Sequence, residues 1–236
     1  IRDDGSVITW GDTYYGGDCS MVAGKITHKT HVNWVAVDKI FSTGSAFAAL
    51  RNDGTVITWG HYDFGGDSSK VADKITNKSS TDWVRVNKIF STEQAFCALR
   101  ADGTVITWGH EDFGANSWHA SGSISEKHSG YWHKVDKIFS TDAAFAALRL
   151  DGTVITWGDT LYGGNSLTVF DHITDKSSPD WVKVEHIFST NTAFSALRAD
   201  GTVITWGLSN SSAVAHKMID KTPNDWIKVV DIFSAD

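Results

Sequence analysis

The chain has 236 residues, of which 41% are hydrophobic and 21% are charged, and its formal net charge at pH 7 is −7. This balance is that of a globular protein with enough apolar material for a large core. Nucleic-acid binding depends on neutralising phosphates, so the acidic charge and the lack of any basic run argue against nucleic acid as the main partner. No apolar run reaches the length of a membrane span, so we expect no insertion into a membrane.

One string of residues recurs along the chain and appears as AFAALRNDGTVITWG at residues 46–60. Its second half opens the chain as IRDDGSVITWG. The Trp residues near its end are spaced 49 residues apart, at Trp10, Trp59, Trp108, Trp157 and Trp206. A period of this length is typical of propellers, solenoids and arrays. We therefore predict one repeat domain over residues 1–236, built from five repeats, and we expect it to be a segment of a longer chain.

Each repeat carries the signals of antiparallel strands. The segments AFAALR and TVITWG flank an Asp-Gly link, which predicts a hairpin because Gly accepts a positive φ. The segment Trp83–Ser91 predicts a third strand, and Ser68–Thr76 is a candidate for a short fourth one. In TVITWG, Val56 points to one face of the sheet while Ile57 and Trp59 point to the other. Such a sheet needs a neighbour on each side.

Stacking around an axis supplies a neighbour to each face of every sheet. We therefore predict an all-β fold, a five-bladed β-propeller of about 49-residue repeats. The Ala-rich AFxAL strand suits a crowded place near the axis. An open superhelical array of the same sheets is the alternative. From the repeat phase of the two ends we expect strands at Ser6–Trp10 and Trp226–Phe233 to share one blade and close the ring.

The repeat also resembles that of a known family. The order A-L, then D-G, then a strand ending in W-G, then a Gly-containing loop is similar to the repeat of the RCC1-like β-propellers, and the resemblance spans all five repeats. It implies a propeller fold. Known members that act as nucleotide-exchange factors have seven blades, longer and more divergent than the five near-identical repeats seen in this sequence.

The loop after each W-G holds the candidate ligand-binding residues. An aromatic residue lies five places after the Trp in the first four repeats, at Tyr15, Phe64, Phe113 and Tyr162. An Asp or Asn lies eight places after it, at Asp18, Asp67, Asn116 and Asn165. An aromatic platform beside a carboxylate or amide acceptor is typical of sugar-binding sites. The alternative is that the Asx side chain caps its own turn and the aromatic ring packs beneath the loop.

Other chemistry is not indicated by the sequence. No nucleophile, phosphate-binding or dinucleotide motif is present, so we predict no enzyme, no catalytic residue and no cofactor. The acids of the Asp-Gly links, such as Asp53, are interpreted as turn formers. The His residues lack zinc spacing and are expected to be exposed, and the loops are too poor in oxygen ligands for calcium, so we predict no metal site. Cys19 and Cys97 occupy non-equivalent repeat positions, which disfavours a disulfide.

We therefore expect a non-catalytic binding or spacer module that is extracellular or displayed at a cell surface. Its partner is expected to be a protein or a glycan, with self-association through a larger parent protein left open. Near-identical repeats favour avidity for a multivalent ligand. The aromatic-rich departure in repeat three, Trp118 and EKHSGYWHK from Glu126, marks either a contact surface or neutral divergence. The alternatives are a multivalent lectin and an RCC1-type regulator of a small GTPase.

Overall fold

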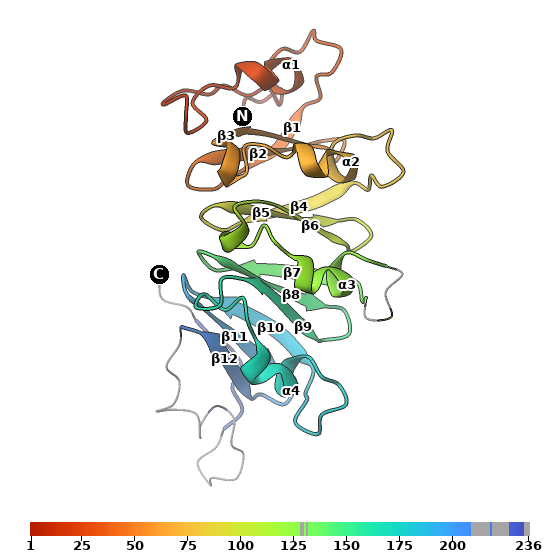
Figure 1. The fold of residues 1–236 in the computed structure, drawn as a ribbon, viewed down its shortest axis with the longest axis vertical. Coiled ribbons are helices and arrows are strands. Elements are labelled where there is room, and N and C mark those ends of the chain that lie inside the picture. The colour runs from red at the N-terminus through yellow and green to blue at the C-terminus, as the bar shows by residue number, and fades with distance from the viewer. Residues whose placement is uncertain (128–129, 131, 209–217, 219–226, 234–236) are drawn as a thin grey trace. The chain divides into compact units, whose positions relative to one another are not determined.

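The computed structural model describes residues 1–127, 130, 132–208, 218 and 227–233. They fall into two compact units, an N-terminal unit of Ile1–Asn116 and a C-terminal unit of Ser117–Asp236. Each unit contains two three-stranded antiparallel sheets, one for each repeat (Figure 1). The search of the described residues found no helix with the length and hydropathy of a membrane span.

The N-terminal unit holds the sheets β1-β2-β3 and β4-β5-β6. Their strands are β1 (Val37–Ser42), β2 (Ala46–Arg51), β3 (Val56–Gly60), β4 (Val86–Ser91), β5 (Ala95–Arg100) and β6 (Val105–Gly109). Short helical turns join the repeats: η1 (Ser20–Val22), α1 (Ala23–Ile26), η2 (Tyr62–Phe64), η3 (Ser69–Val71), α2 (Ala72–Ile75) and η4 (Glu111–Phe113).

The C-terminal unit repeats this plan with the sheets β7-β8-β9 and β10-β11-β12. Its strands are β7 (Val135–Ser140), β8 (Ala144–Arg149), β9 (Val154–Gly158), β10 (Val184–Ser189), β11 (Ala193–Arg198) and β12 (Val203–Gly207). Its helical turns are η5 (Trp118–Ala120), α3 (Ser121–Ile124), η6 (Leu167–Val169) and α4 (Phe170–Ile173).

The predicted hairpin forms in all four sheets. In the first one the Arg51 amide donates to the Thr55 carbonyl at 2.9 Å and the Gly54 amide donates to the Arg51 carbonyl at 2.8 Å. Gly54 has φ of 81°, a value that favours glycine. The AFxAL strand is the central strand of each sheet, paired on both sides. Its small side chains therefore let neighbouring sheets approach closely.

Both faces of the sheets are buried, as the alternation in TVITWG predicts. Val56 packs in a core between the two sheets of the N-terminal unit, together with Ile75, Phe96 and Trp108. Ile57 and Trp59 pack on the opposite face, in a cluster that includes Val7 and Ile26. In the C-terminal unit an equivalent core joins Val154, Ile173, Phe194 and Trp206. Hydrophobic packing between neighbouring repeats therefore stabilises each unit.

One expectation about strands is wrong and another is confirmed in part. Ser68–Thr76 is helical, η3 followed by α2, because its apolar Val71 and Ile75 are four residues apart and Ile75 is fully buried. The strand expected from Trp83 begins only at Val86, and its pairing with β5 shifts register between Val86 and Lys88.

The two end segments form no strands. Residues 6–10 carry the string SVITW but lie outside any sheet, and Trp10 is 83% exposed whereas Trp59 is 6% exposed. Residues 227–233 also lie outside any sheet, and Trp226 lies outside the described residues. In the four complete sheets both outer strands pair with an AFxAL strand.

Candidate functional site

The Asx residues of the candidate site support their own turns. Asp18 accepts a hydrogen bond from the Ser20 amide at 2.8 Å and another from the Ser20 hydroxyl at 3.0 Å. Asp67 makes the same two bonds with Ser69. Each carboxylate thus uses both oxygens at the start of a short helical turn.

The Asn members of this set are exposed. Asn165 accepts a hydrogen bond from the Leu167 amide at 2.9 Å, which begins η6 in the same manner. Asn116 lies at the same repeat position, before η5. The turn-capping interpretation therefore accounts for Asp18, Asp67 and Asn165.

The residue two places after the repeat Trp divides the loops into two kinds. Asp12 and Asp159 cap their own turns by accepting from the amides of Tyr14 and Leu161. His61 and His110 hold the same position in repeats two and three, and a 3-10 turn follows each of them. An imidazole at this place is free to pack against the aromatic residue three positions later.

The result is a continuous row of rings on the N-terminal unit. Tyr14 packs edge-on against His61 with ring centroids 4.4 Å apart, and the Tyr14 hydroxyl lies 2.5 Å from His61 Nε2. His61 stacks on Phe64 at 4.1 Å and 14°. Phe64 then contacts His110 at 5.9 Å, and His110 packs edge-on against Phe113 at 5.4 Å. Tyr15 extends the row, 5.4 Å from Tyr14. We call these six residues the aromatic ladder.

The aromatic ladder is partly open to solvent. Tyr14 is 61% exposed and Tyr15 is 53% exposed, while His61, Phe64, His110 and Phe113 are half-buried. Tyr62, which lies beside the ladder in η2, is 64% exposed. Exposed aromatic rings that are fixed by their neighbours offer contact area at low entropic cost, which suits ligand binding.

The structure brings together three of the four aromatic residues predicted from the sequence. Tyr15, Phe64 and Phe113 belong to the aromatic ladder. Tyr162 lies in the C-terminal unit, where it packs against the core of that unit. Its loop has Asp159 in place of a His, and no ring contact of Tyr162 is present among the described residues. The four loops are therefore not equivalent.

Tyr14, His61 and His110 are members of the ladder that the sequence did not predict. The His residues were expected to be exposed, whereas these two are half-buried within the ladder. The signal was their register, since both lie two places after the repeat Trp in adjacent repeats. His128 lies outside the described residues, and His119 in η5 contacts the exposed Trp118 with ring centroids 4.8 Å apart.

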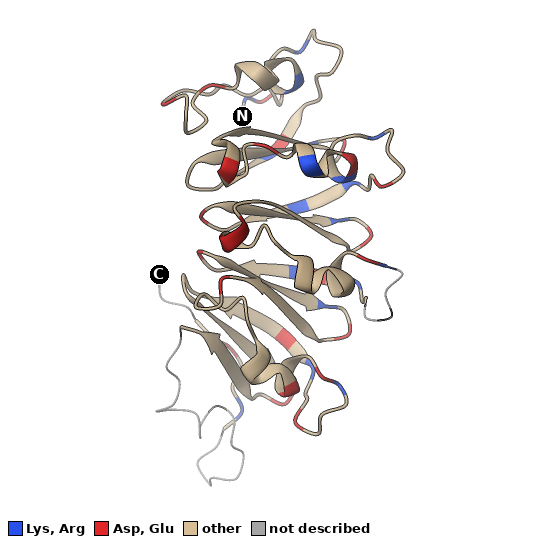
Figure 2. Ribbon diagram, in the orientation of Figure 1, with Lys and Arg blue, Asp and Glu red and all other residues tan. Residues whose placement is uncertain are grey.

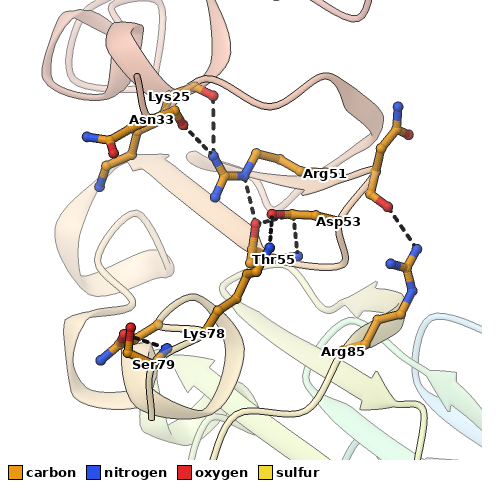
Figure 3. Close-up of polar contacts among 10 residues, drawn as sticks. Lys25, Asn33, Arg51, Asp53, Thr55, Lys78, Ser79 and Arg85 are labelled. Carbon is orange, nitrogen blue, oxygen red and sulfur yellow. Dashed lines mark hydrogen bonds and ion pairs between the residues drawn. The ribbon is translucent and has the colours of Figure 1, made fainter. Parts of the chain in front are cut away.

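A cluster of polar side chains at the hairpin turns has a structural role (Figure 3). The buried Arg51 donates from Nε to the Thr55 hydroxyl at 2.8 Å and from Nη1 to the Asn33 carbonyl at 3.0 Å. Asp53 accepts from the Thr55 amide and hydroxyl, and its other oxygen pairs with Lys78 at 3.2 Å. Arg51 and Asp53 thus link neighbouring repeats, and Asp53 is the turn former predicted from sequence.

The other residues that the sequence singled out do not come together as a site among the described residues. Among the described residues, no three His, Cys, Asp or Glu side chains gather as a metal ion would require. Cys19 and Cys97 are buried and free, and burial raises the pKa of the Cys97 thiol. Trp118 is 74% exposed, and residues 128, 129 and 131 of the aromatic-rich run lie outside the described residues.

Fold and loops together define a class of protein: a tandem array of the small antiparallel sheets from which propellers are built, with an aromatic surface on one unit. No family model matches the sequence, and no curated protein matches it either.

The chain is similar to several solved structures. The ectodomain of the Physcomitrella patens receptor kinase CR4 shares 16% identity at a TM-score of 0.43, over 78% of this chain and 43% of that one. Human WBSCR16 shares 17% identity at a TM-score of 0.45, over 92% of this chain and 59% of that one. Yeast RCC1 (Prp20), solved with Kap60, shares 17% identity at a TM-score of 0.47, over 87% of this chain and 50% of that one. This chain therefore spans only about half the length of these RCC1-like proteins.

Proposed function

We propose that this chain is a non-catalytic binding module whose ligand surface is the aromatic ladder. The observation that carries the proposal is the continuity of the ladder: six rings from three successive loops form one row of contacts, and the two Tyr rings at one end of the row remain more than half exposed. Packing of a fold does not require such a row at the surface, and no ring contact joins Tyr162, in the equivalent loop of the C-terminal unit, to another described residue. The proposed ligand is a protein or another surface molecule, which the chain would bind outside the cell or at the cell surface.

A ligand screen on variants tests this function. Peptide and glycan arrays are probed with the wild-type chain, with Tyr14→Ala/Tyr62→Ala and with Leu161→Ala. Leu161 is the matched control because it holds the repeat position of Tyr14 in the C-terminal unit and is 65% exposed. We expect the double variant to lose at least about tenfold in affinity for any ligand found, and the control to bind as wild type. A double variant that keeps every interaction would exclude the ladder as the ligand surface.

A glycan ligand is the second candidate, because exposed Tyr rings also suit sugars. Its weakness is that Asp18 and Asp67, the acceptors predicted for sugar hydroxyls, already use both oxygens within their turns. The same arrays separate the two ligand classes. Regulation of a small GTPase stays a third alternative, for which a nucleotide-exchange assay on a panel of GTPases is the direct test.

The proposed architecture is a five-bladed ring, and it needs its own test. Dyes are attached to Asp3→Cys and Asp231→Cys in a Cys19→Ser/Cys97→Ala background. Both replacement residues occur at the equivalent positions of other repeats, since Ser68 corresponds to Cys19 and Ala48 corresponds to Cys97. Ring closure predicts efficient energy transfer between the two dyes. Transfer near zero would favour the open array.

A further inference from the structure

The rim of the aromatic ladder is acidic. The three loops that build it, residues 11–20, 60–69 and 109–116, contain no Lys or Arg. They contain six acidic residues: Asp12, Asp18, Asp63, Asp67, Glu111 and Asp112. In Figure 2 the short helical turns that follow β3 and β6 carry red segments. The ladder therefore lies in a negative field within the N-terminal unit.

Three of these carboxylates face solvent without a role in the turns. Asp63, Glu111 and Asp112 lie in the first turns of η2 and η4, and all three are exposed. The side chains of Asp63 and Glu111 make no hydrogen bond or ion pair with any described residue. Asp112 is 82% exposed and lies 4.0 Å from His110 Nδ1. These carboxylates remain available for a ligand, unlike Asp18 and Asp67.

The combination of open rings and free carboxylates selects for a cation. A guanidinium group stacks on aromatic faces and pairs with a carboxylate through two parallel hydrogen bonds. An anionic ligand would meet six negative charges, and a neutral one would leave Asp63, Glu111 and Asp112 unused. Arginine side chains of a partner protein satisfy both features at once.

The spacing of the ladder also indicates the form of the partner. The ring centroids of His61 and His110 are joined through Phe64 by separations of 4.1 and 5.9 Å, so equivalent points in repeats two and three lie within about 10 Å. A polyproline II helix has three residues per turn and rises about 9 Å over them. Side chains at every third residue therefore share one face, at a spacing that fits within this upper limit. In a β-strand, residues three apart point to opposite faces.

We propose that the aromatic ladder binds a basic peptide segment in the polyproline II conformation, with Arg at every third residue over the rings, one paired with Asp63 in repeat two and the next with Glu111 and Asp112 in repeat three. This inference rests on the proposed binding function of the ladder and names the chemistry of its partner.

Two fluorescent peptides of one composition test the inference by anisotropy. One is (Arg-Pro-Pro)3, and the other has its three Arg residues adjacent and followed by six Pro residues. The full chain is compared with Asp63→Asn/Glu111→Gln/Asp112→Asn, which keeps every ring. The control, Asp136→Asn/Asp171→Asn/Glu185→Gln, removes the same charge from exposed positions of the C-terminal unit.

We expect (Arg-Pro-Pro)3 to bind the wild-type chain at least about fivefold more tightly than the clustered peptide. The ladder variant is expected to lose at least about tenfold in affinity for (Arg-Pro-Pro)3, and the control less than about twofold. Equal binding of the two peptides, or equal losses in the two variants, would overturn the inference.

The proposed function can stand when this inference fails. If (Arg-Pro-Pro)3 does not bind but a neutral glycan does, and Tyr14→Ala/Tyr62→Ala abolishes that binding, the ladder is a ligand surface for another class. If the Tyr variants keep all binding found on the arrays, the function fails and the inference fails with it.

Discussion

At the scale of single residues, the repeats are joined by buried polar side chains that the hydrophobic pattern does not reveal. Arg51, Arg100, Arg149 and Arg198 are all buried, and each donates from Nε to the Thr four residues later. In the first of these, burial lowers the pKa of the Arg51 guanidinium, which Asp53 opposes. A buried charge is tolerated only when its hydrogen bonds are satisfied, so these groups fix the position of one repeat against the next.

Removing one of these guanidinium groups should destabilise the chain. Arg51→Ala leaves the Asn33 carbonyl and the Thr55 hydroxyl without a donor, and we expect a loss of about 2 to 4 kcal/mol in the free energy of unfolding. Arg85→Ala is the control, since Arg85 is exposed and its guanidinium donates to the Asn52 carbonyl at the surface, so its loss should cost less than about 1 kcal/mol. Urea denaturation measures both, and equal losses would contradict a linking role for Arg51.

Stability should fall in acid through the Asp residues of the hairpin turns. Burial raises the pKa of Asp151, but hydrogen bonds from Thr153 and Lys176 and the charge of Arg149 outweigh this effect and lower it to about 2. A carboxyl group whose folded pKa is depressed stabilises the fold above its unfolded pKa, near 4, and loses that contribution as the pH falls toward 2. The contribution is about 1 kcal/mol after solvent screening.

Asp151→Asn should therefore flatten this acid dependence. Denaturation curves between pH 7 and pH 2 are compared with those of Asp136→Asn, which changes an exposed carboxyl on β7. If the Asp151 and Asp136 variants lose stability in parallel with the wild type between pH 4 and pH 2, Asp151 has no such role.

At the scale of elements, the hairpin is set by a glycine whose place leaves no room for a side chain. Gly54 has φ of 81°, and a Cβ built on it would come within 3.2 Å of the Arg85 side chain at three atoms. Gly152 has φ of 85° and meets Lys183 in the same way. The side chain over each hairpin comes from the next repeat, so the turn is shaped by local geometry and by its neighbour.

Replacing this glycine should weaken the hairpin. Gly54→Ala forces an L side chain into the left-handed region and against Arg85, and we expect a loss of about 1 to 3 kcal/mol. Gly44→Ala is the matched control, because its Cβ would meet only the Glu93 carbonyl, at 3.4 Å. Thermal unfolding measures the difference. A Gly44 variant that is as unstable as the Gly54 variant would rule out the conformational explanation.

At the scale of the whole molecule, packing contacts join each repeat to its sequence neighbours within a unit. Ile75 and Ile173 hold equivalent positions in α2 and α4, and both are fully buried in the cores of their respective units. In repeat proteins, stability is close to a sum of such local terms, so damage to one core need not spread evenly along the chain.

A pair of cavity variants tests how far repeats unfold together. Ile75→Ala should cost about 2 to 5 kcal/mol and lower hydrogen-exchange protection mainly in β1 to β6, whereas Ile173→Ala should lower it mainly in β7 to β12. Peptide-resolved hydrogen exchange of the full chain gives both profiles. Uniform loss of protection in both variants would show that residues 1–236 behave as one cooperative domain.

The sequence alone determined the period, the Asp-Gly hairpins and the burial of both faces of TVITWG, because these depend on local backbone geometry and on alternation along a strand. The sequence also singled out Tyr15, Phe64 and Phe113, three members of the aromatic ladder, from their register after the repeat Trp. Only the tertiary structure decided that Ser68–Thr76 is helical, that residues 6–10 form no strand and that Arg51 links repeats. It also decided that His61 and His110 join the rings of three loops. These features depend on contacts between neighbouring repeats, which a pattern within one repeat does not encode.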